Sequence, residues 1–264
     1  MRPVAPHPPL SPQPARVHPG RPQPLLSTLP LGFGKPRTVS PSQLSLGLES
    51  LPAQTRESFV ESSSNATAAR ALDAWPDGVG GAIAIVGPHG SGKSHLLRAW
   101  AERTGAVLLE GELAALADLA QLEGRLVAID DADHADDETL FHLINLAAVE
   151  GAGLVLASRE SPAAWEVALP DLRSRLNAVR IVKLGEPDDE VLRGVLVRFF
   201  EQHAVRPAPE LLEYLVRRIE RSVPEARAVV RRLVEKASPR HRPITRALAR
   251  EILETETDGG EYPA

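Results

Sequence analysis

Cysteine is absent from this sequence of 264 residues, and aromatic residues make up only 4% of it. Without cysteine the chain can form neither a disulfide framework nor a thiolate metal site, which suits a reducing cytoplasm. Hydrophobic runs are short, and none approaches the roughly 18–20 residues that a membrane helix needs. The hydrophobic fraction of 43% is ordinary for a globular domain, which excludes full disorder. We therefore expect a cytoplasmic protein that has no membrane among its partners.

Acidic residues are missing from the first 41 residues, which hold five basic residues and 12 of the 24 prolines. The whole chain has a net charge of −5, so residues 42–264 carry −10. Such an acidic domain argues against a dedicated nucleic-acid binder, whose surface is usually basic. The proline-rich arm has no periodic apolar face and is predicted to be disordered or locally polyproline-like. A transit peptide and a translation start further downstream are alternatives that the composition does not separate.

Apolar strand patterns alternate with helical patterns as far as residue 186, and only helical patterns follow. Alternation of this kind predicts an α/β fold, in which a parallel sheet is covered by helices on both faces. Asp188 is a plausible N-cap, and Pro224 and Pro243 stand where helices would start. The predicted strands are residues 82–86, 106–109, 126–129, 153–157 and 180–184. The predicted helices are 66–75, 94–104, 114–122 and 137–148 in the first part, then 188–203, 210–219, 224–237 and 244–253.

Residues 87–94, GPHGSGKS, match the phosphate-binding pattern G-x-x-x-x-G-K-[ST] in full, between a predicted strand and a predicted helix. Glycines let backbone N–H groups surround phosphates, and the start of the helix adds a positive dipole. Lys93 offers its charge to the β- and γ-phosphates, and Ser94 offers a hydroxyl to Mg²⁺. We therefore predict binding of ADP or ATP with Mg²⁺. The predicted nucleotide-binding residues are Gly87, Pro88, His89, Gly90, Ser91, Gly92, Lys93, Ser94 and His95.

Asp130 and Asp131 follow the apolar run of the third predicted strand. The carboxyl ends of parallel strands meet at one edge of a sheet, so both acids should lie near the phosphate loop. We predict that Asp130, together with Ser94, holds Mg²⁺ and that Asp131 polarises an attacking water. Two acids that merely cap a strand are the simpler reading, and for Asp131 the two readings are evenly balanced.

Two further segments carry polar groups to the same region. The fourth strand ends at Ser158 and Arg159, where a polar side chain could touch a γ-phosphate or simply meet solvent. Arg173 and Arg175 precede the last strand, and on their own they are best read as part of a solvated basic turn. The peptide at 43–48 is short and apolar with a polar first residue, and such a segment can dock in an extended form into a partner's pockets.

In this order the elements resemble the AAA+ ATPases of the DnaA/Hda group over residues 43 to about 254, and within that group the Hda-type regulators. QLSLGL at 43–48 looks like their sliding-clamp-binding peptide, with Gly47 where proline is usual. The stretch between residues 106 and 130 leaves little room for the insertion with which initiators contact single-stranded DNA. The chain also ends after the helical lid, where an initiator would continue into a helix-turn-helix domain. The residues expected to bind the clamp are Gln43, Leu44, Ser45, Leu46, Gly47 and Leu48.

This resemblance implies a AAA+ P-loop base, a helical lid and a regulatory role in replication. Arg175 matches the arginine finger of the family, which acts on a nucleotide held by a neighbouring protein. Through it, a bacterial, nucleoid-associated regulator bound to the clamp would stimulate ATP hydrolysis by a DnaA-type initiator and prevent re-initiation. DNA would be contacted only through the clamp, and self-association is left open. The expected parts are an arm (1–41), clamp peptide and linker (42–54), base (55–186), lid (187–254) and disordered tail (255–264).

Two departures from the family pattern concern the chain's own chemistry. Pro224 stands where the sensor arginine of the lid is usual, so Arg221 or Arg227 would have to replace it. Arg159 stands where the fourth strand usually ends in aspartate. Both changes predict weak or absent intrinsic ATPase activity. An ATP-hydrolysing remodeller similar to a helicase loader and a DNA-binding initiator paralogue are the alternative functions.

Overall fold

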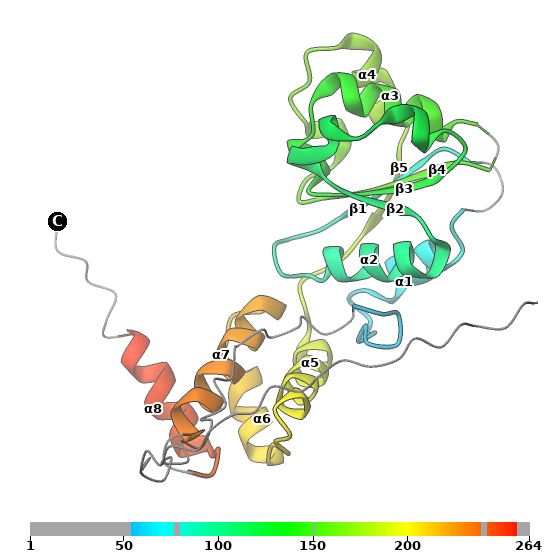
Figure 1. The fold of residues 1–264 in the computed structure, drawn as a ribbon. Coiled ribbons are helices and arrows are strands. Elements are labelled where there is room, and N and C mark those ends of the chain that lie inside the picture. The colour runs from blue at the N-terminus through cyan, green and yellow to red at the C-terminus, as the bar shows by residue number, and fades with distance from the viewer. Residues whose placement is uncertain (1–53, 77–79, 150, 239–241, 258–264) are drawn as a thin grey trace, which may run out of the picture. The chain divides into compact units, whose positions relative to one another are not determined.

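The structure, a computed structural model, describes residues 54–76, 80–149, 151–238 and 242–257. The predicted arm, the clamp peptide at 43–48 and all but three residues of the predicted tail lie outside them. The described residues fall within one compact unit of the chain and form a sheet-based part followed by a helical lid (Figure 1).

Five parallel strands form one sheet in the order β2-β3-β4-β1-β5. The three inner strands, β3, β4 and β1, are almost wholly buried, which explains why their sequences are nearly continuous apolar runs and do not alternate with polar residues. The strands are β1 (Ala82–Val86), β2 (Val107–Glu110), β3 (Leu126–Asp130), β4 (Gly153–Ser158) and β5 (Arg180–Lys183). The predicted parallel α/β fold is confirmed.

Helices cover both faces of the sheet, with α1 and α2 on one face and α3 and α4 on the other (Figure 1). Alternate side chains of β1 serve the two layers: Ile83 and Ile85 pack with α1 and α2, and Ala84 and Val86 with α3 and α4. These helices are α1 (Ala66–Asp73), α2 (Lys93–Thr104), α3 (Asp137–Ala147) and α4 (Pro170–Asn177). Packing on both faces therefore fixes the position of β1 and of the phosphate loop that follows it.

The helix predicted at 114–122 is wrong. The chain there forms two short 3₁₀ helices, η1 (Gly111–Leu116) and η2 (Leu119–Leu122). Between them the side chain of Asp118 accepts a hydrogen bond from Ala120 N at 3.1 Å and so caps η2. An aspartate that bonds locally to the backbone competes with helix continuation, which explains the break.

Helix α4 occupies a segment whose composition on its own favours a solvated basic turn. Pro170 starts the helix, and its apolar residues Leu172 and Leu176 are buried against α3 and the sheet. Two apolar residues four apart are enough to anchor a helix of two turns, although they are too few to predict it.

Four helices form the lid: α5 (Asp189–Gln202), α6 (Pro209–Val216), α7 (Val223–Ala237) and α8 (Arg246–Thr257). Their shared core includes the fully buried Leu196, Phe200 and Leu215. Asp188 caps α5 through Val191 N at 3.0 Å, as predicted. Because α8 runs to Thr257, helix continues three residues past the predicted lid boundary at 254. In the described ranges, no helix is long and apolar enough to cross a bilayer.

The lid core yields a stability prediction. Leu196→Ala removes a side chain with 0% exposure and leaves a cavity between α5 and its neighbours, so the free energy of unfolding should fall by about 2–5 kcal/mol. Leu116, 82% exposed on η1, is the matched control, and its change to alanine should cost less than about 0.5 kcal/mol. Urea denaturation of both variants would measure the difference. Equal losses would contradict this account of the core.

Candidate functional site

The phosphate loop joins β1 to α2, as predicted, and its backbone has the left-handed turns that glycine allows. Gly92, at φ +98°, is the residue just before α2, and Gly90 has φ +72°. Lys93 is 7% exposed, and its Nζ donates hydrogen bonds to Gly87 O at 2.8 Å and Pro88 O at 3.0 Å. Burial lowers the pKa of Lys93, with nearby Asp131 acting against that shift. The ammonium group of Lys93 is thus held against the backbone of the glycine-rich loop.

A hydroxyl and a carboxylate meet next to this loop. Asp130, 2% exposed at the end of β3, accepts a hydrogen bond from Ser94 Oγ to its Oδ1 at 3.0 Å. Burial raises the pKa of Asp130, while Ser94 and Arg98 act against that shift. In the described part of the chain no group of three or more His, Cys, Asp or Glu side chains surrounds a metal position. Mg²⁺ commonly takes only one or two protein oxygens and completes its shell with phosphates and water, so Ser94 and Asp130 fit this ion.

Asp131 has left-handed backbone angles, φ 47° and ψ 51°, which are uncommon outside glycine. Space for this turn comes from Gly111, because a Cβ there would overlap the carbonyl oxygen of Asp131. The turn places Asp131 on the wall of the cavity described next, whereas Asp130 stays behind Ser94. Strained backbone of this kind is often found at functional sites.

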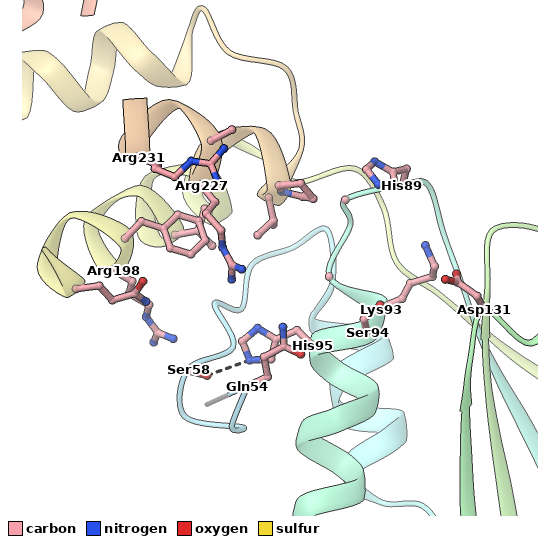
Figure 2. Close-up of a pocket in the computed structure, with 18 of the residues that line it drawn as sticks. Gln54, Ser58, His89, Lys93, Ser94, His95, Asp131, Arg198, Arg227 and Arg231 are labelled. Atoms are coloured by element: carbon pink, nitrogen blue, oxygen red, sulfur yellow. Dashed lines mark hydrogen bonds between the residues drawn. The ribbon is translucent and has the colours of Figure 1, made fainter. Parts of the chain in front are cut away.

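A cavity of about 480 Å³ lies between the sheet-based part and the lid (Figure 2). Two contacts join its walls: Val223 N of α7 donates to Gly90 O at 3.1 Å, and Arg198 Nη2 of α5 donates to Glu57 O at 2.8 Å. Its lining comprises Gln54, Ser58, His89, Gly90, Gly92, Lys93, Ser94, His95, Asp131, Arg159, Val195, Arg198, Phe199, Gln202, Val223, Pro224, Arg227, Ala228 and Arg231.

Positive charge dominates this lining. It contains five cationic side chains, Lys93, Arg159, Arg198, Arg227 and Arg231, and a single carboxylate, Asp131. Two of these arginines have partners other than carboxylates: Arg198 donates to Glu57 O, and Arg227 lies 5.1 Å from the centre of the Phe199 ring. An excess of cations in a concave site attracts a polyanion, and a nucleotide polyphosphate has the matching charge.

The other end of the cavity is formed by His95 and the segment before α1. His95 Nε2 lies 3.0 Å from Thr55 O and 3.0 Å from Ser58 Oγ, and Phe59 packs edge-on at 5.5 Å. Because a carbonyl only accepts, we assign the proton of the ring to Nε2. Burial lowers the pKa of His95, and so do Arg198 and Arg227, while the hydrogen bond with Thr55 O acts against the shift; the lowered pKa favours the neutral ring. A flat, neutral ring beside hydroxyl and amide groups suits a nucleobase better than a phosphate.

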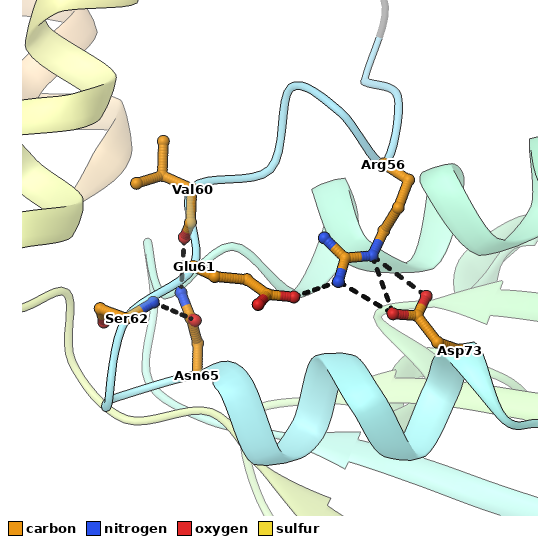
Figure 3. A network of polar contacts seen from close by, with 6 residues as sticks. All are labelled: Arg56, Val60, Glu61, Ser62, Asn65 and Asp73. Carbon is orange, nitrogen blue, oxygen red and sulfur yellow. Dashed lines mark hydrogen bonds and ion pairs between the residues drawn. The ribbon is translucent and has the colours of Figure 1, made fainter.

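A network of polar contacts holds that segment in place (Figure 3). Arg56 binds both carboxylate oxygens of Asp73 in α1, at 2.8–3.1 Å, and also pairs with Glu61. Asn65 closes the following turn through Val60 O at 2.9 Å. The network explains how the segment before α1 brings Gln54, the last residue of the predicted linker, and Ser58, of the predicted base, to the cavity. No sequence motif indicated this role.

The predicted site residues within the described ranges fall into three groups. The lining includes His89, Gly90, Gly92, Lys93, Ser94, His95 and Asp131. Gly87, Pro88, Ser91 and Asp130 stand behind it, and Ser91 Oγ is buried without a hydrogen-bond partner in the described part of the chain. Arg175 is elsewhere: it is exposed on α4, 5.2 Å from the centre of the Phe141 ring, and makes no ion pair with described residues.

The two candidate lid arginines separate clearly. Arg227 lines the cavity, whereas Arg221 is tied to Asp189 at 2.7 Å and to Pro187 O at 3.2 Å outside it. At the end of β4, Arg159 lines the cavity, and Ser158 donates instead to Glu160 O at 2.7 Å. Beside Asp130, two further residues went unpredicted: Arg98, four residues after Ser94 on α2, and Glu110, its partner at the end of β2.

Comparison with known proteins adds the family. No protein-family model matches the chain. DnaA, the chromosomal replication initiator of Caulobacter vibrioides, is 28% identical over 237 residues, covering 76% of this chain and 48% of DnaA. Domain III of Thermotoga maritima DnaA superimposes with a TM-score of 0.67 at 21% identity, over 78% of this chain and 97% of that domain. AMPPCP-bound DnaA from Aquifex aeolicus does so with a TM-score of 0.61 at 19% identity, over 79% and 71% of the two chains.

The chain is a AAA+ protein of the DnaA/Hda type. It spans about half the length of the Caulobacter DnaA proteins that it matches. This DnaA/Hda-type protein thus shares the fold of a nucleotide-binding domain with those relatives. Its glycine-rich loop follows β1, and Asp130 ends β3.

A pair of lid variants tests the cavity. Arg227→Ala removes a cation from the lining and should weaken ADP binding about tenfold, since a charge-assisted contact contributes roughly 1.5–3 kcal/mol. Arg221→Ala, two residues before α7 begins, should change the affinity less than about twofold because its partners lie outside the cavity. Calorimetric titration with ADP measures both. A larger loss for Arg221 than for Arg227 would refute the placement of the nucleotide.

Proposed function

We propose that this protein is a nucleotide-bound regulator of replication initiation, which docks on the sliding clamp and stimulates hydrolysis of ATP held by a DnaA-type initiator. One observation carries the proposal: Arg175 is exposed, has no carboxylate partner among the described residues and lies outside the chain's own cavity. A guanidinium placed in this way is available to a nucleotide on a neighbouring molecule. The family of the chain supports this reading.

Phosphoryl transfer explains why one arginine is enough. Its transition state gathers charge on the phosphate oxygens, and catalysis depends mainly on placing opposite charge there. An arginine supplied by a second protein can raise the rate about 10³–10⁵-fold. Arg175 can leave its place over the ring of Phe141 at little cost, because an exposed cation–π contact contributes only about 0.5–1 kcal/mol.

The chain's own cavity would hold ADP or ATP as a structural ligand. Lys93 and Arg227 would bind phosphate oxygens, and His95 would contact the base. Mg²⁺, when bound through Ser94 and Asp130, would neutralise part of the phosphate charge. Pro224 has no charge to offer, and Arg159 adds a cation where the family has an acid, so we expect little hydrolysis by the protein itself.

Clamp docking rests on the sequence, because residues 43–48 lie outside the described part of the chain. Gln43, Leu46 and Leu48 match the positions that anchor such peptides. The net charge of −10 for residues 42–264 supports contact with DNA through the clamp over a direct grip on DNA.

An ATP-hydrolysing remodeller remains the second candidate, favoured by the place of Asp131 on the cavity wall. ATP turnover by the isolated protein, lost in Lys93→Ala, would favour it. Binding to duplex DNA at physiological salt without the clamp would instead favour an initiator paralogue.

The arginine finger is tested in a reconstitution with initiator–ATP and DNA-loaded clamp. Arg175→Ala should keep clamp binding and lose at least about 10³-fold of the stimulation of ATP hydrolysis. Arg125→Ala removes another exposed arginine of the same part and should stimulate like the wild type. Released phosphate is the readout. Full stimulation by the Arg175 variant would overturn the mechanism.

The docking peptide is tested separately. Gln43→Ala combined with Leu46→Ala should abolish retention on immobilised clamp, because it removes both the polar anchor and an apolar anchor. ADP binding by the same variant should equal that of the wild type, since the cavity residues are unchanged. Clamp binding that survives the double change would rule out this peptide as the docking element.

A further inference from the structure

Arg98 lies at the centre of a polar network behind the cavity. This residue of α2 follows Ser94 by one helical turn. Its Nη2 donates to Glu110 Oε1 at 3.1 Å and to Asp130 Oδ2 at 3.3 Å, and its Nη1 donates to Gln54 Oε1 at 3.2 Å. Ser94 occupies the other oxygen of Asp130. Both oxygens of the carboxylate that would serve Mg²⁺ are therefore engaged by the chain itself.

Asp130 depends on this partner for its charge. Its side chain is only 3% exposed, and an isolated carboxylate so deeply buried is strongly disfavoured. Lys93, the other nearby cation, donates to the carbonyls of Gly87 and Pro88. Among described residues, Arg98 makes the one ion pair with Asp130. The guanidinium thus supplies the positive charge that a metal ion would otherwise bring.

We propose that Arg98 is a built-in counter-ion of Asp130, which competes with Mg²⁺ and makes nucleotide binding less dependent on that ion. The inference rests on the proposed nucleotide binding and adds a positioning residue to that site. A unit positive charge within a few ångströms of the carboxylate opposes the approach of a second cation. The competition is electrostatic, so it acts even where Mg²⁺ reaches Asp130 only through water.

Glu110 moderates the competition. It pairs with Asp130 across the β2–β3 ladder, and its side chain is 49% exposed. The carboxylates of Glu110 and Asp130 share the same nitrogen of Arg98. Removing the charge of Glu110 leaves Arg98 entirely to Asp130, and removing Arg98 leaves Asp130 to the metal. The two changes should therefore shift the magnesium dependence in opposite directions.

The test measures the dissociation constant of a fluorescent ADP analogue in excess EDTA and in millimolar Mg²⁺. The readout is the ratio of the value in EDTA to the value in Mg²⁺, which is large when binding depends strongly on the ion. Arg98→Met should raise this ratio about tenfold over the wild type, because the competing charge is gone. Glu110→Gln should lower it about two- to threefold. Arg98→Lys retains the charge and should stay within about threefold of the wild type. Arg103→Met, on the same helix but bonded among the described residues to Leu72 O, is the matched control and should not change the ratio.

A second measurement needs no nucleotide. Mg²⁺ alone should raise the thermal midpoint of Arg98→Met more than that of the wild type, because the ion replaces the lost counter-charge at Asp130. An unchanged affinity ratio in Arg98→Met would overturn the inference while leaving nucleotide binding intact. If Arg98→Met does not fold, Glu110→Gln decides. A ratio of dissociation constants below that of the wild type supports the proposal, and a ratio equal to or above it refutes the proposal. Failure of the wild type to bind ADP would instead remove the proposed function, and the Mg²⁺ shift would still report on Arg98.

Discussion

The hydrogen bond from Ser94 Oγ to Asp130 Oδ1, 3.0 Å long, joins residues 36 positions apart and holds the two halves of the site together. It can form because β1 and β3 run parallel on either side of β4, so both strands end at the same edge of the sheet. The phosphate loop follows β1 there, and Asp130 ends β3 there. Buried apolar layers on both faces keep the strands in that register. The polar geometry of the site thus depends on apolar packing some distance from it.

Closure of the cavity depends on a second close approach, between the phosphate loop and the lid. Gly90 accepts the hydrogen bond of Val223 N, and a Cβ on Gly90 would lie 2.5 Å from Ser222 Oγ. Ser222 is 3% exposed and caps α7, so it has little freedom to move away. A shift of the loop backbone around a phosphate is therefore passed directly to the first turn of α7. The loop and the lid are thus in direct contact, although they belong to different parts of the fold.

The sequence predicted those features that depend on neighbours along the chain. The glycine pattern of the phosphate loop, the acids at the end of β3 and the cap of α5 are local, and each lies where it was expected. Contacts between distant segments were not predictable: Arg98 meets Asp130 and Gln54 only after three elements come together. The helix predicted at 114–122 is wrong for a local reason: in the structure the side-chain hydrogen bond of Asp118 outweighs the helical spacing of the apolar residues. The difference between Arg221 and Arg227 likewise depends on where α7 begins.

The start of α7 also affects whether the protein can distinguish ATP from ADP. Pro224 lines the cavity at the usual sensor position but has neither a charge nor a donor N–H. The next cation, Arg227, lies three residues later, which moves it about 4.5 Å along the helix axis and about 60° around it. It also packs on the ring of Phe199, which restrains it toward α5. A guanidinium displaced and restrained in this way is poorly placed to report the loss of one terminal phosphate. Such a lid would close similarly over ADP and ATP, which supports a regulator whose bound nucleotide is structural and whose catalytic arginine serves another protein.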